Sequence, residues 1–230
     1  MTKQKNDPIR DLWGWVASIL GALLRPPLQK LPPPKPDDKP ELDKVRRDGW
    51  EPFVGPIRKI PKGLAERIEV YGDPSITYTA TGKIRVSRKF ARGFVVVPAS
   101  ALPGIGKRIY MNRKVVPYLR EALRRASITA PDYIFERVGC YNPRHMRHDK
   151  RMPLSDHTWG IAFDINASRN RARYRKPGDP LPFTPGWEKY SDIPKEVVDA
   201  FESVGFTWGG RWGNGKRGGF IDPMHFSLRK

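Results

Sequence analysis

Two short stretches in the C-terminal third of the chain hold the side chains best suited to chemistry. The first contains His157 and Asp164, and the second contains Asp222 and His225, three residues apart across Pro223. Two imidazoles and one carboxylate, with a fourth position left for water, form the ligand pattern of a catalytic zinc site. A single buried histidine is more simply explained as a core residue with satisfied hydrogen bonds. The joint pattern of the two stretches instead favours a metal site.

The elements around these residues must bring them together. After Gly160 the residues alternate like a strand, with Ile161, Phe163 and Ile165 on one face and Ala162, Asp164 and Asn166 on the other. A carboxylate in so apolar a strand is costly to bury unless it is paired or bound to a metal. Gly160 allows the preceding loop to turn, so that His157 folds back towards Asp164.

The second stretch predicts a strand as well. Met224, Phe226 and Leu228 alternate into a core, which places His225 on the opposite face with Ser227. A turn at Pro223 then brings the Asp222 carboxylate within reach of the group that His225 holds.

These motifs resemble a known family. Ser155-x-His157-x-x-Gly160-x-Ala162-x-Asp164, followed by Asp222-x-x-His225, is similar to the zinc cell-wall peptidases. That family includes D-alanyl-D-alanine carboxypeptidases, vancomycin-resistance D,D-peptidases and phage L-alanyl-D-glutamate endolysins. The resemblance spans roughly residues 133–228, and it includes the Gly-Phe-x-Trp-Gly-Gly-x-Trp loop that ends at Trp212 and the Gly-x-Tyr-Asn-Pro-Arg turn that ends at Arg144. Residues 1 to about 60 resemble no family.

The resemblance implies a role for each matching residue. One zinc ion per chain would be held by His157, Asp164 and His225, with Asp222 as the general base. Zinc lowers the pKa of bound water to about 7 and polarises a carbonyl, and Asp222 would take the proton and pass it to the leaving amine. Arg144 would stabilise the oxyanion or grip a substrate carboxylate, because a guanidinium stays charged and donates in a fork.

Three further residues would lie around this centre. Ser155 is expected beside the ligands. Trp208 and Trp212 are expected to line the substrate groove, although aromatic packing under a glycine-rich loop explains them equally well.

The family resemblance also implies a substrate. The expected reaction is hydrolysis of peptidoglycan stem peptides at the bacterial cell wall, by a periplasmic, extracellular or phage-delivered enzyme. An Asp before Pro-Met-His resembles the endolysin branch, which cuts between L-alanine and D-glutamate. D-alanyl-D-alanine carboxypeptidase activity is the alternative.

Composition and charge are compatible with such a partner. The chain has 230 residues and a formal net charge of +19, which implies an anionic partner such as nucleic acid, acidic lipid or cell wall. Basic runs at 169–176 and 211–217 flank the two motifs. A nucleic-acid-binding protein with Tyr174 and the tryptophans as stacking platforms is a rival interpretation, but it leaves the four-residue constellation unexplained. A virion structural protein is a third.

Other candidate ligands carry less weight. Cys140 is the single cysteine, which excludes an intramolecular disulfide and any multi-cysteine zinc finger and favours a buried thiol. His145 and His148 are three residues apart, but the basic residues around them would repel a cation.

The N-terminal region has a different character. Residues 12–24 form an apolar run of thirteen residues, shorter than the roughly 20 that cross a bilayer. Arg25-Pro26-Pro27 follows where a cleavage site would be expected, so no cleaved signal peptide is predicted. A helix there would need burial on the main domain, a protein partner, a second copy or a membrane surface.

Proline and charge then separate this tail from the body of the chain. Seven of the sixteen residues 25–40 are proline, which predicts a stiff spacer. We therefore expect a hydrophobic helical tail at 1–25, a proline-rich and charged linker at 26–60 and a zinc peptidase domain at 61–230.

Within that domain strands and helices mix without strict βαβ alternation, which predicts an α+β fold with a small antiparallel sheet and flanking helices. The pattern predicts strands at 67–71, 83–90, 93–97 and 133–138, and helices at 114–126 and 194–204.

Overall fold

The computed structural model describes residues 53, 55, 63–102, 104–213 and 219–228. All of them fall within one contact unit, Asp43–Lys230. The predicted hydrophobic helix at 12–24 and nearly all of the predicted linker at 26–60 lie outside the described residues. Within the described part of the chain, no helix is long and apolar enough to span a membrane.

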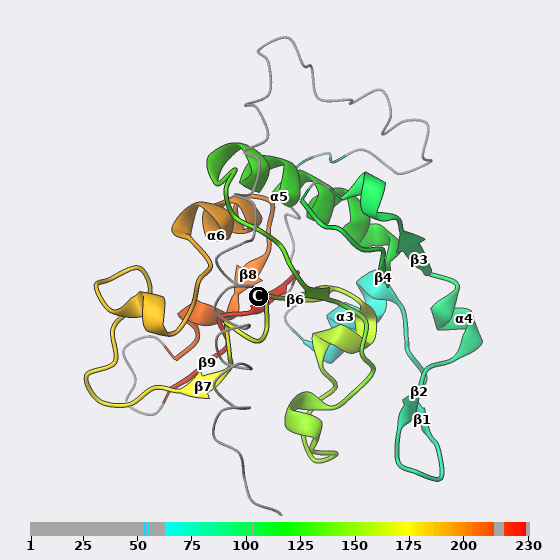
Figure 1. The fold of residues 1–230 in the computed structure, drawn as a ribbon. Helices are drawn as coiled ribbons and strands as arrows, with labels where there is room; N and C mark the ends of the chain where they lie inside the picture. The colour runs from blue at the N-terminus through cyan, green and yellow to red at the C-terminus, as the bar shows by residue number, and fades with distance from the viewer. Residues whose placement is uncertain (1–52, 54, 56–62, 103, 214–218, 229–230) are drawn as a thin grey trace, which may run out of the picture. The chain divides into compact units, whose positions relative to one another are not determined.

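Helices and strands alternate irregularly along the described chain (Figure 1). The helices are α3 (Leu64–Tyr71), α4 (Arg88–Ala91), α5 (Val116–Thr129) and α6 (Lys195–Glu202). The strands are β1 (Thr77–Tyr78), β2 (Ile84–Arg85), β3 (Phe94–Val97), β4 (Ile109–Asn112), β5 (Val138–Gly139), β6 (Ala162–Ile165), β7 (Arg173–Tyr174), β8 (Thr207–Trp208), β9 (Phe220–Ile221) and β10 (His225–Ser227). The predicted α+β class with small antiparallel sheets is confirmed.

The largest sheet positions the candidate site. Its strand order is β5-β6-β10-β8, and every neighbouring pair is antiparallel. Phe226 of β10 is paired with Phe163 of β6 and with Trp208 of β8, so these three rings share one face. Asp164 is paired with His225 on the opposite face. One face of the sheet is therefore aromatic core and the other carries polar side chains.

Helix α6 covers the aromatic face. Its ring Phe201 lies with its centroid 4.6 Å from that of Phe226, and α6 also packs against α5 (Figure 1). The apolar face of α5 is fully buried, as helical spacing predicts, and consists of Val116, Leu119, Ala122, Leu123 and Ala126. The two helices thus hold the sheet from behind, away from the polar face.

Three predicted elements are confirmed. The helix predicted at 114–126 is α5, with Pro117 in its first turn, where a missing N–H is tolerated. The helix predicted at 194–204 is α6, and the strand predicted at 93–97 is β3.

The strand predicted at 67–71 is wrong, because these residues form most of helix α3. The two buried residues of α3 are Arg67 and Tyr71, four apart, which is a helical period. Arg67 is buried because its Nη1 lies 2.7 Å from Oδ1 of Asp156 and its guanidinium lies over the Trp159 ring. A charged residue in a core position hid the helical pattern.

Two other predicted strands are mostly wrong. In the segment 83–90 only Ile84–Arg85 is strand, because Ser87 caps a new helix by accepting a hydrogen bond from the Phe90 N–H at 3.2 Å. In the segment 133–138 only Val138 belongs to a strand. The carbonyl of Ile134 accepts instead from the side-chain amide of Asn166.

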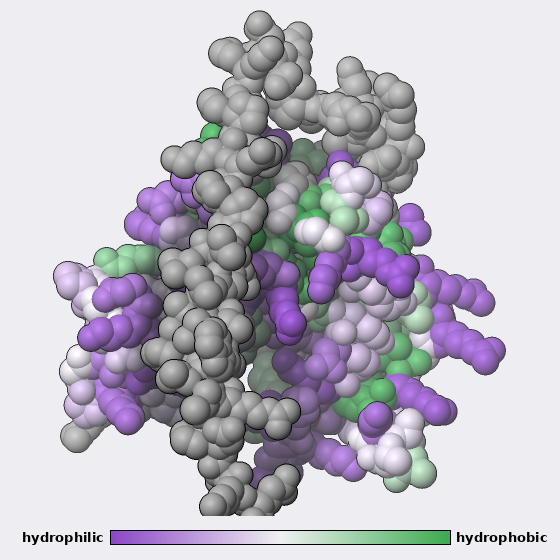
Figure 2. All heavy atoms as spheres, in the orientation of Figure 1, coloured by the Kyte–Doolittle hydropathy of each residue, from purple (hydrophilic) through white to green (hydrophobic). Residues whose placement is uncertain are grey.

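Hydrophilic side chains make up most of the described surface on the face shown in Figure 2, with smaller hydrophobic areas between them. This surface agrees with the high charge of the sequence.

Candidate metal centre

A tight turn presents His157. Ser155 Oγ accepts a hydrogen bond from the His157 N–H at 3.4 Å, and the turn closes at Gly160, whose φ is +62°. A Cβ atom at Gly160 would lie 2.9 Å from the main-chain nitrogen of Asn112. Both the conformation and the close approach require glycine at this position.

The main chain fixes the proton on the His157 ring. His157 Nδ1 lies 2.6 Å from the carbonyl oxygen of Cys140, and a carbonyl can only accept, so Nδ1 carries the hydrogen. The other ring nitrogen, Nε2, is left with a lone pair and lies 3.2 Å from Asp164 Oδ1. This is the usual way in which an outer hydrogen bond prepares a histidine to bind a metal.

Strand pairing brings the other two side chains together. Asp164 of β6 and His225 of β10 are direct partners in the ladder. His225 Nδ1 lies 3.1 Å from the same oxygen, Asp164 Oδ1, and the rings of His157 and His225 have centroids 5.1 Å apart. The three side chains predicted as metal ligands therefore converge.

The arrangement fits a cation. One ligand atom from each of the three residues lies within 4.8 Å of the other two, and no other such group of three occurs among the described residues. Burial alone would raise the pKa of Asp164, but its contacts with His157 and His225 hold that pKa well below its usual range. Burial acts to lower the pKa of His225, yet the contact with Asp164 raises it. The lowered pKa of Asp164 and the raised pKa of His225 both mean that the cluster attracts positive charge. Two nitrogen ligands with one oxygen ligand suit zinc.

Asp222 lies in the turn that leads into β10. Its carbonyl accepts from the His225 N–H at 3.0 Å, and its own N–H donates to the Gly209 carbonyl at 3.0 Å. A Cβ atom on Gly209 would collide with the Asp222 carbonyl oxygen, so the glycine-rich loop must pass close to this turn. Within the described residues, the buried Asp222 Oδ1 has no hydrogen-bond partner.

The environment of Asp222 suits proton transfer. Burial raises its pKa to about 6; the charge of His225 opposes this rise and that of Asp164 adds to it. A carboxyl with a pKa near 6 exchanges protons close to neutral pH, as a general base must.

Arg144 and Ser155 form one unit beside the His157 turn. Arg144 Nη1 donates to Ser155 Oγ at 2.7 Å, and the Ser155 N–H donates to the Arg144 carbonyl at 2.9 Å. The positive charge of Arg144 acts to lower the pKa of Asp222, so the guanidinium lies within electrostatic range of that carboxyl. The two other arginines of this segment are engaged elsewhere: Arg147 lies over the Tyr174 ring, and Arg151 pairs with Asp149.

The two predicted groove tryptophans differ. Trp208 is 1% exposed; it stacks on Phe183, and its Nε1 donates to the Pro223 carbonyl at 2.7 Å. It is mainly a core residue that supports the Asp222 turn. Trp212 is 38% exposed, and its ring centroid lies 5.2 Å from that of His225. Of these two tryptophans, Trp212 is the one with a substantial open surface beside the predicted metal ligands.

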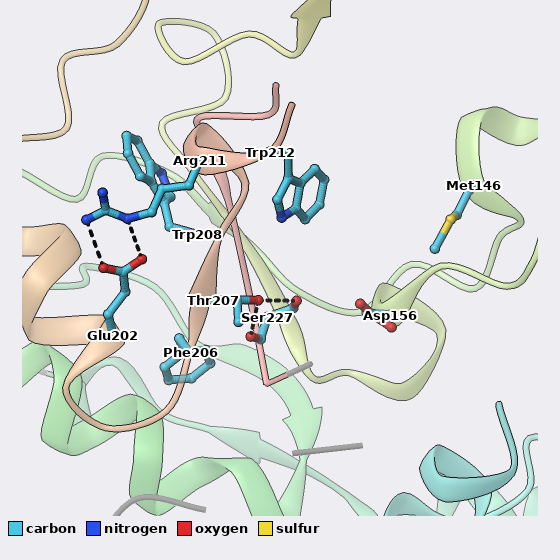
Figure 3. Close-up of a pocket in the computed structure, with 9 residues that line it drawn as sticks. All are labelled: Met146, Asp156, Glu202, Phe206, Thr207, Trp208, Arg211, Trp212 and Ser227. Atoms are coloured by element: carbon cyan, nitrogen blue, oxygen red, sulfur yellow. Dashed lines mark hydrogen bonds and ion pairs between the residues drawn. The ribbon is translucent and has the colours of Figure 1, made fainter. Parts of the chain in front are cut away.

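A cleft of about 610 Å³ adjoins the centre (Figure 3). Its lining residues are Met146, Asp156, Glu202, Phe206, Thr207, Trp208, Arg211, Trp212 and Ser227. Ser227 and Thr207 are partners across β10 and β8, and Ser227 lies two residues from His225 on the same strand face. The cleft thus continues the polar face that carries Asp164 and His225.

Part of this cleft was predicted from the sequence. Trp208 and Trp212 were expected to line a groove, and Ser227 was placed on the same strand face as His225, whereas Met146, Asp156 and Glu202 come from separate segments and were not predicted. The Cys140 carbonyl was missed as well, because a main-chain acceptor leaves no mark on residue type.

The remaining candidates do not join the centre. His145 uses its ring nitrogens on the Met152 carbonyl at 2.6 Å and the Tyr78 hydroxyl at 2.7 Å. Neither His145 nor His148 belongs to the metal-binding group found among the described residues. Cys140 is buried, and burial raises the pKa of its thiol well above the usual range.

Comparison with known proteins agrees with this geometry. A family model described as D-alanyl-D-alanine carboxypeptidase matches residues 148–228. This segment contains His157, Asp164, Asp222 and His225, whereas Arg144 precedes it. No curated protein and no solved structure gives a significant match. Over residues 148–228 the chain is therefore similar to the D-alanyl-D-alanine carboxypeptidases.

Proposed function

We propose that this chain is a zinc peptidase that hydrolyses stem peptides of bacterial peptidoglycan. The observation that carries the proposal is the convergence of His157 Nε2 and His225 Nδ1 on Asp164 Oδ1. The family similarity over residues 148–228 supports the reaction class. We further propose that the ion is zinc, bound once per chain, and that the protein acts at the cell wall.

The chain's own residues would share the work of peptide hydrolysis. When bound, zinc supplies a Lewis acid and lowers the pKa of water to about 7. Asp222 accepts a proton from the attacking water and returns it to the leaving amine, because it is a buried carboxyl whose Oδ1 has no hydrogen-bond partner among the described residues. Arg144, held by Ser155, directs positive charge towards the oxygen that becomes negative.

The cleft beside the centre would hold the substrate. Trp212 provides an exposed aromatic surface next to His225, and the wall formed by Thr207 and Ser227, whose side chains bond to each other's strand, lies across the cleft (Figure 3). A volume of about 610 Å³ lies within the range of small-ligand pockets, roughly 300–1,000 Å³. It is large enough for a short peptide segment.

The preferred scissile bond joins L-alanine and D-glutamate. The proposal depends on Asp222 preceding Pro-Met-His, a sequence that resembles the endolysin branch. D-alanyl-D-alanine carboxypeptidase activity is the second candidate, because the matching family model carries that description. In that case Arg144 would grip the terminal carboxylate of the substrate.

Product analysis tests the proposal and separates the two bonds. Purified peptidoglycan is digested with the zinc-loaded protein, and the new termini are identified by mass spectrometry. New amino-terminal glutamate is expected, whereas release of free D-alanine alone would favour the carboxypeptidase. A digest with neither product, from a protein that binds zinc, would contradict the proposed substrate.

Two other partners, besides the peptide substrate, follow from the sequence. Residues 12–24 are proposed to bring the enzyme to a membrane surface or a protein partner, since thirteen apolar residues require burial. Nucleic-acid binding is the rival function, and salt-sensitive binding of single-stranded DNA without peptidase activity would favour it.

A further inference from the structure

Asn170 connects the two strands that carry Asp164 and His225. It is 0% exposed and follows β6 in the chain. Its carbonyl accepts from the Met224 N–H at 3.1 Å, and the Met224 carbonyl accepts from the Ile165 N–H at 2.9 Å. Met224 is next to His225, and Ile165 is next to Asp164. These main-chain hydrogen bonds therefore involve the neighbours of two proposed metal ligands.

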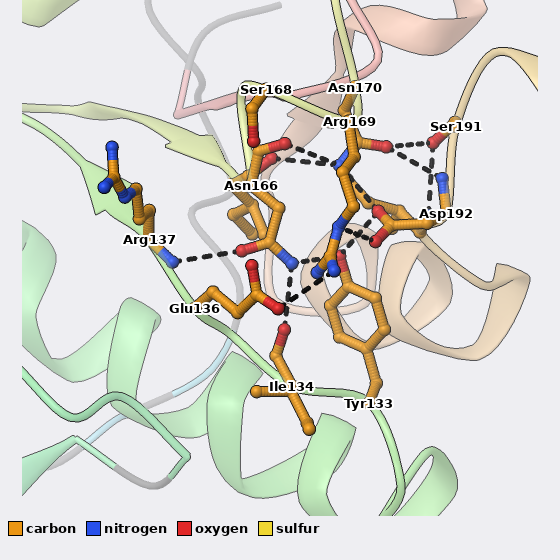
Figure 4. A network of polar contacts seen from close by, with 12 residues as sticks. Tyr133, Ile134, Glu136, Arg137, Asn166, Ser168, Arg169, Asn170, Ser191 and Asp192 are labelled. Atoms are coloured by element: carbon orange, nitrogen blue, oxygen red, sulfur yellow. Dashed lines mark hydrogen bonds and ion pairs between the residues drawn. The ribbon is translucent and has the colours of Figure 1, made fainter. Parts of the chain in front are cut away.

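The Asn170 side chain makes five hydrogen bonds (Figure 4). The two hydrogens on its Nδ2 are shared among three acceptors, the carbonyls of Ile165 and Asn166, at 3.3 and 3.1 Å, and Asp192 Oδ1 at 2.7 Å. Its Oδ1 accepts from Ser191 Oγ at 2.7 Å and from the Asp192 N–H at 2.9 Å. Donors and acceptor are all in use, so the amide is fixed in one orientation.

Only an amide satisfies this environment. A carboxylate at position 170 would place oxygen against two carbonyls and the Asp192 carboxylate, with no hydrogen to donate. An apolar side chain would remove all five of these contacts.

The side-chain contacts of Asn170 join the end of β6 to the segment before α6. The carbonyls of Ile165 and Asn166 belong to the end of β6, and Ser191 and Asp192 belong to the segment before α6. The turn after β6 is thereby fixed against the segment that leads into the covering helix. We propose that Asn170 is a positioning residue: its side chain fixes the turn after β6, holds the strand that carries Asp164 in place, and so tunes the affinity and geometry of the metal site. This inference rests on the proposed metal site.

A second buried asparagine provides a matched control. Asn112 is 3% exposed, and its Oδ1 accepts from the Lys114 N–H at 3.1 Å at the start of a helical turn. Its side chain makes no described hydrogen bond to β6 or β10. Loss of the Asn112 amide removes a buried polar contact without loosening the ligand strands.

The test uses the full chain and the metal alone. Zinc affinity is measured by competition with a chromophoric chelator, and the ligand field is read from the visible spectrum of the cobalt-substituted protein. Asn170→Ala is expected to weaken zinc binding about 10- to 100-fold, as other outer contacts of metal ligands do, and to change the cobalt spectrum. Asn112→Ala is expected to leave both readouts unchanged, even though it lowers stability.

A milder pair of variants covers the case in which Asn170→Ala does not fold. Asp192→Ala removes the acceptor closest to Asn170 Nδ2. Glu136→Ala removes an ion-pair partner of Arg169 and leaves the acceptors of Asn170 in place. Asp192→Ala is expected to weaken zinc binding several-fold, and Glu136→Ala is not. Equal affinity in these two variants would overturn the inference.

The outcomes also separate this inference from the proposed function. If the unaltered chain binds zinc and cleaves stem peptides while Asn170→Ala binds zinc equally well with the same cobalt spectrum, only the role of Asn170 fails. If the unaltered chain binds no zinc, both fail.

Discussion

Asp164 and His225 are 61 residues apart in the chain, yet they face each other in register across β6 and β10, with Oδ1 and Nδ1 3.1 Å apart. Antiparallel pairing thus sets the distance between two predicted metal ligands, and a slip of one residue would turn one of them into the aromatic core. Phe163 and Phe226, which are paired one position along, oppose that slip because they are fully buried on the other face.

Removal of both histidine ligands should abolish zinc binding. The double variant His157→Ala, His225→Ala leaves one carboxylate, which cannot hold zinc alone at micromolar concentration. Metal analysis after gel filtration measures the result. The matched control replaces the chain's other two histidines, His145 and His148, and should retain one zinc per chain. Full zinc occupancy in the first variant would exclude the assignment.

Asp222→Asn should separate catalysis from metal binding. The amide keeps the shape of the side chain but cannot take a proton, so kcat should fall by about 10² to 10⁴ while zinc remains bound. Steady-state kinetics on a soluble stem peptide, with zinc analysis, checks both. Asp199→Asn, on the exposed side of α6, is the control and should have normal turnover. Near-normal turnover of Asp222→Asn would eliminate Asp222 as the base.

The same substitution should change stability in a pH-dependent way in the metal-free protein. Burial raises the pKa of Asp222 from 3.8 to about 6, so folding favours its neutral form. The favourable contribution is complete below pH 3.8 and is lost as the pH rises through 6. A difference of about two pKa units corresponds to at most about 3 kcal/mol.

Metal-free Asp222→Asn is therefore expected to be more stable than the unaltered protein at pH 8, by about 1–3 kcal/mol, and equally stable near pH 4. Urea unfolding in EDTA at both pH values measures the difference. A stability change that is the same at pH 4 and pH 8 would contradict the expected titration.

The ion pair of Arg67 and Asp156 should support the fold behind the cleft. Their side chains are 3% and 5% exposed, and Arg67 also lies over Trp159. Arg67→Ala should destabilise the protein by about 3–5 kcal/mol, because it removes one partner of a buried pair. Arg67→Lys keeps the positive charge and should lower the free energy of unfolding by less than Arg67→Ala does. Denaturant unfolding measures both, and a loss below about 1 kcal/mol for Arg67→Ala would refute the expectation.

Removal of residues 1–49 should spare bond cleavage. The proline-rich spacer is expected to uncouple the tail from the residues that bind metal. The truncated protein should cleave a small soluble peptide at the normal rate and bind intact cell walls less well. A hundredfold loss of peptide cleavage with retained fold and zinc would make the tail part of the catalytic unit.

The clustering of the three predicted ligands could be inferred because metal chemistry restricts residue types. His157, Asp164 and His225 stand out where an apolar pattern surrounds them, and strand alternation places Asp164 and His225 on the faces opposite the core. Gly160 was predictable for a similar reason, since its φ of +62° is a conformation that favours glycine.

Helix α3 and the contributions of Met146, Asp156 and Glu202 to the cleft were not predictable from local pattern. In α3 the buried positions are Arg67 and Tyr71, and the partner of Arg67 is 89 residues away in the chain. The segment 133–138 likewise has a strand-like composition, but its Ile134 carbonyl is satisfied by a distant Asn166. Contacts of this kind depend on the completed fold, and residue types within one window do not encode them.

The bond from His157 Nδ1 to the Cys140 carbonyl has an evolutionary consequence. Every amino acid has a carbonyl, so this acceptor survives any replacement of the Cys140 side chain that the core can accommodate. Natural variation at position 140 should follow volume and hydrophobicity, and it should be independent of whether the protein is active. The orientation of the His157 ring therefore depends on the position of the main chain at residue 140, and only a change that moves this main chain can remove the hydrogen bond.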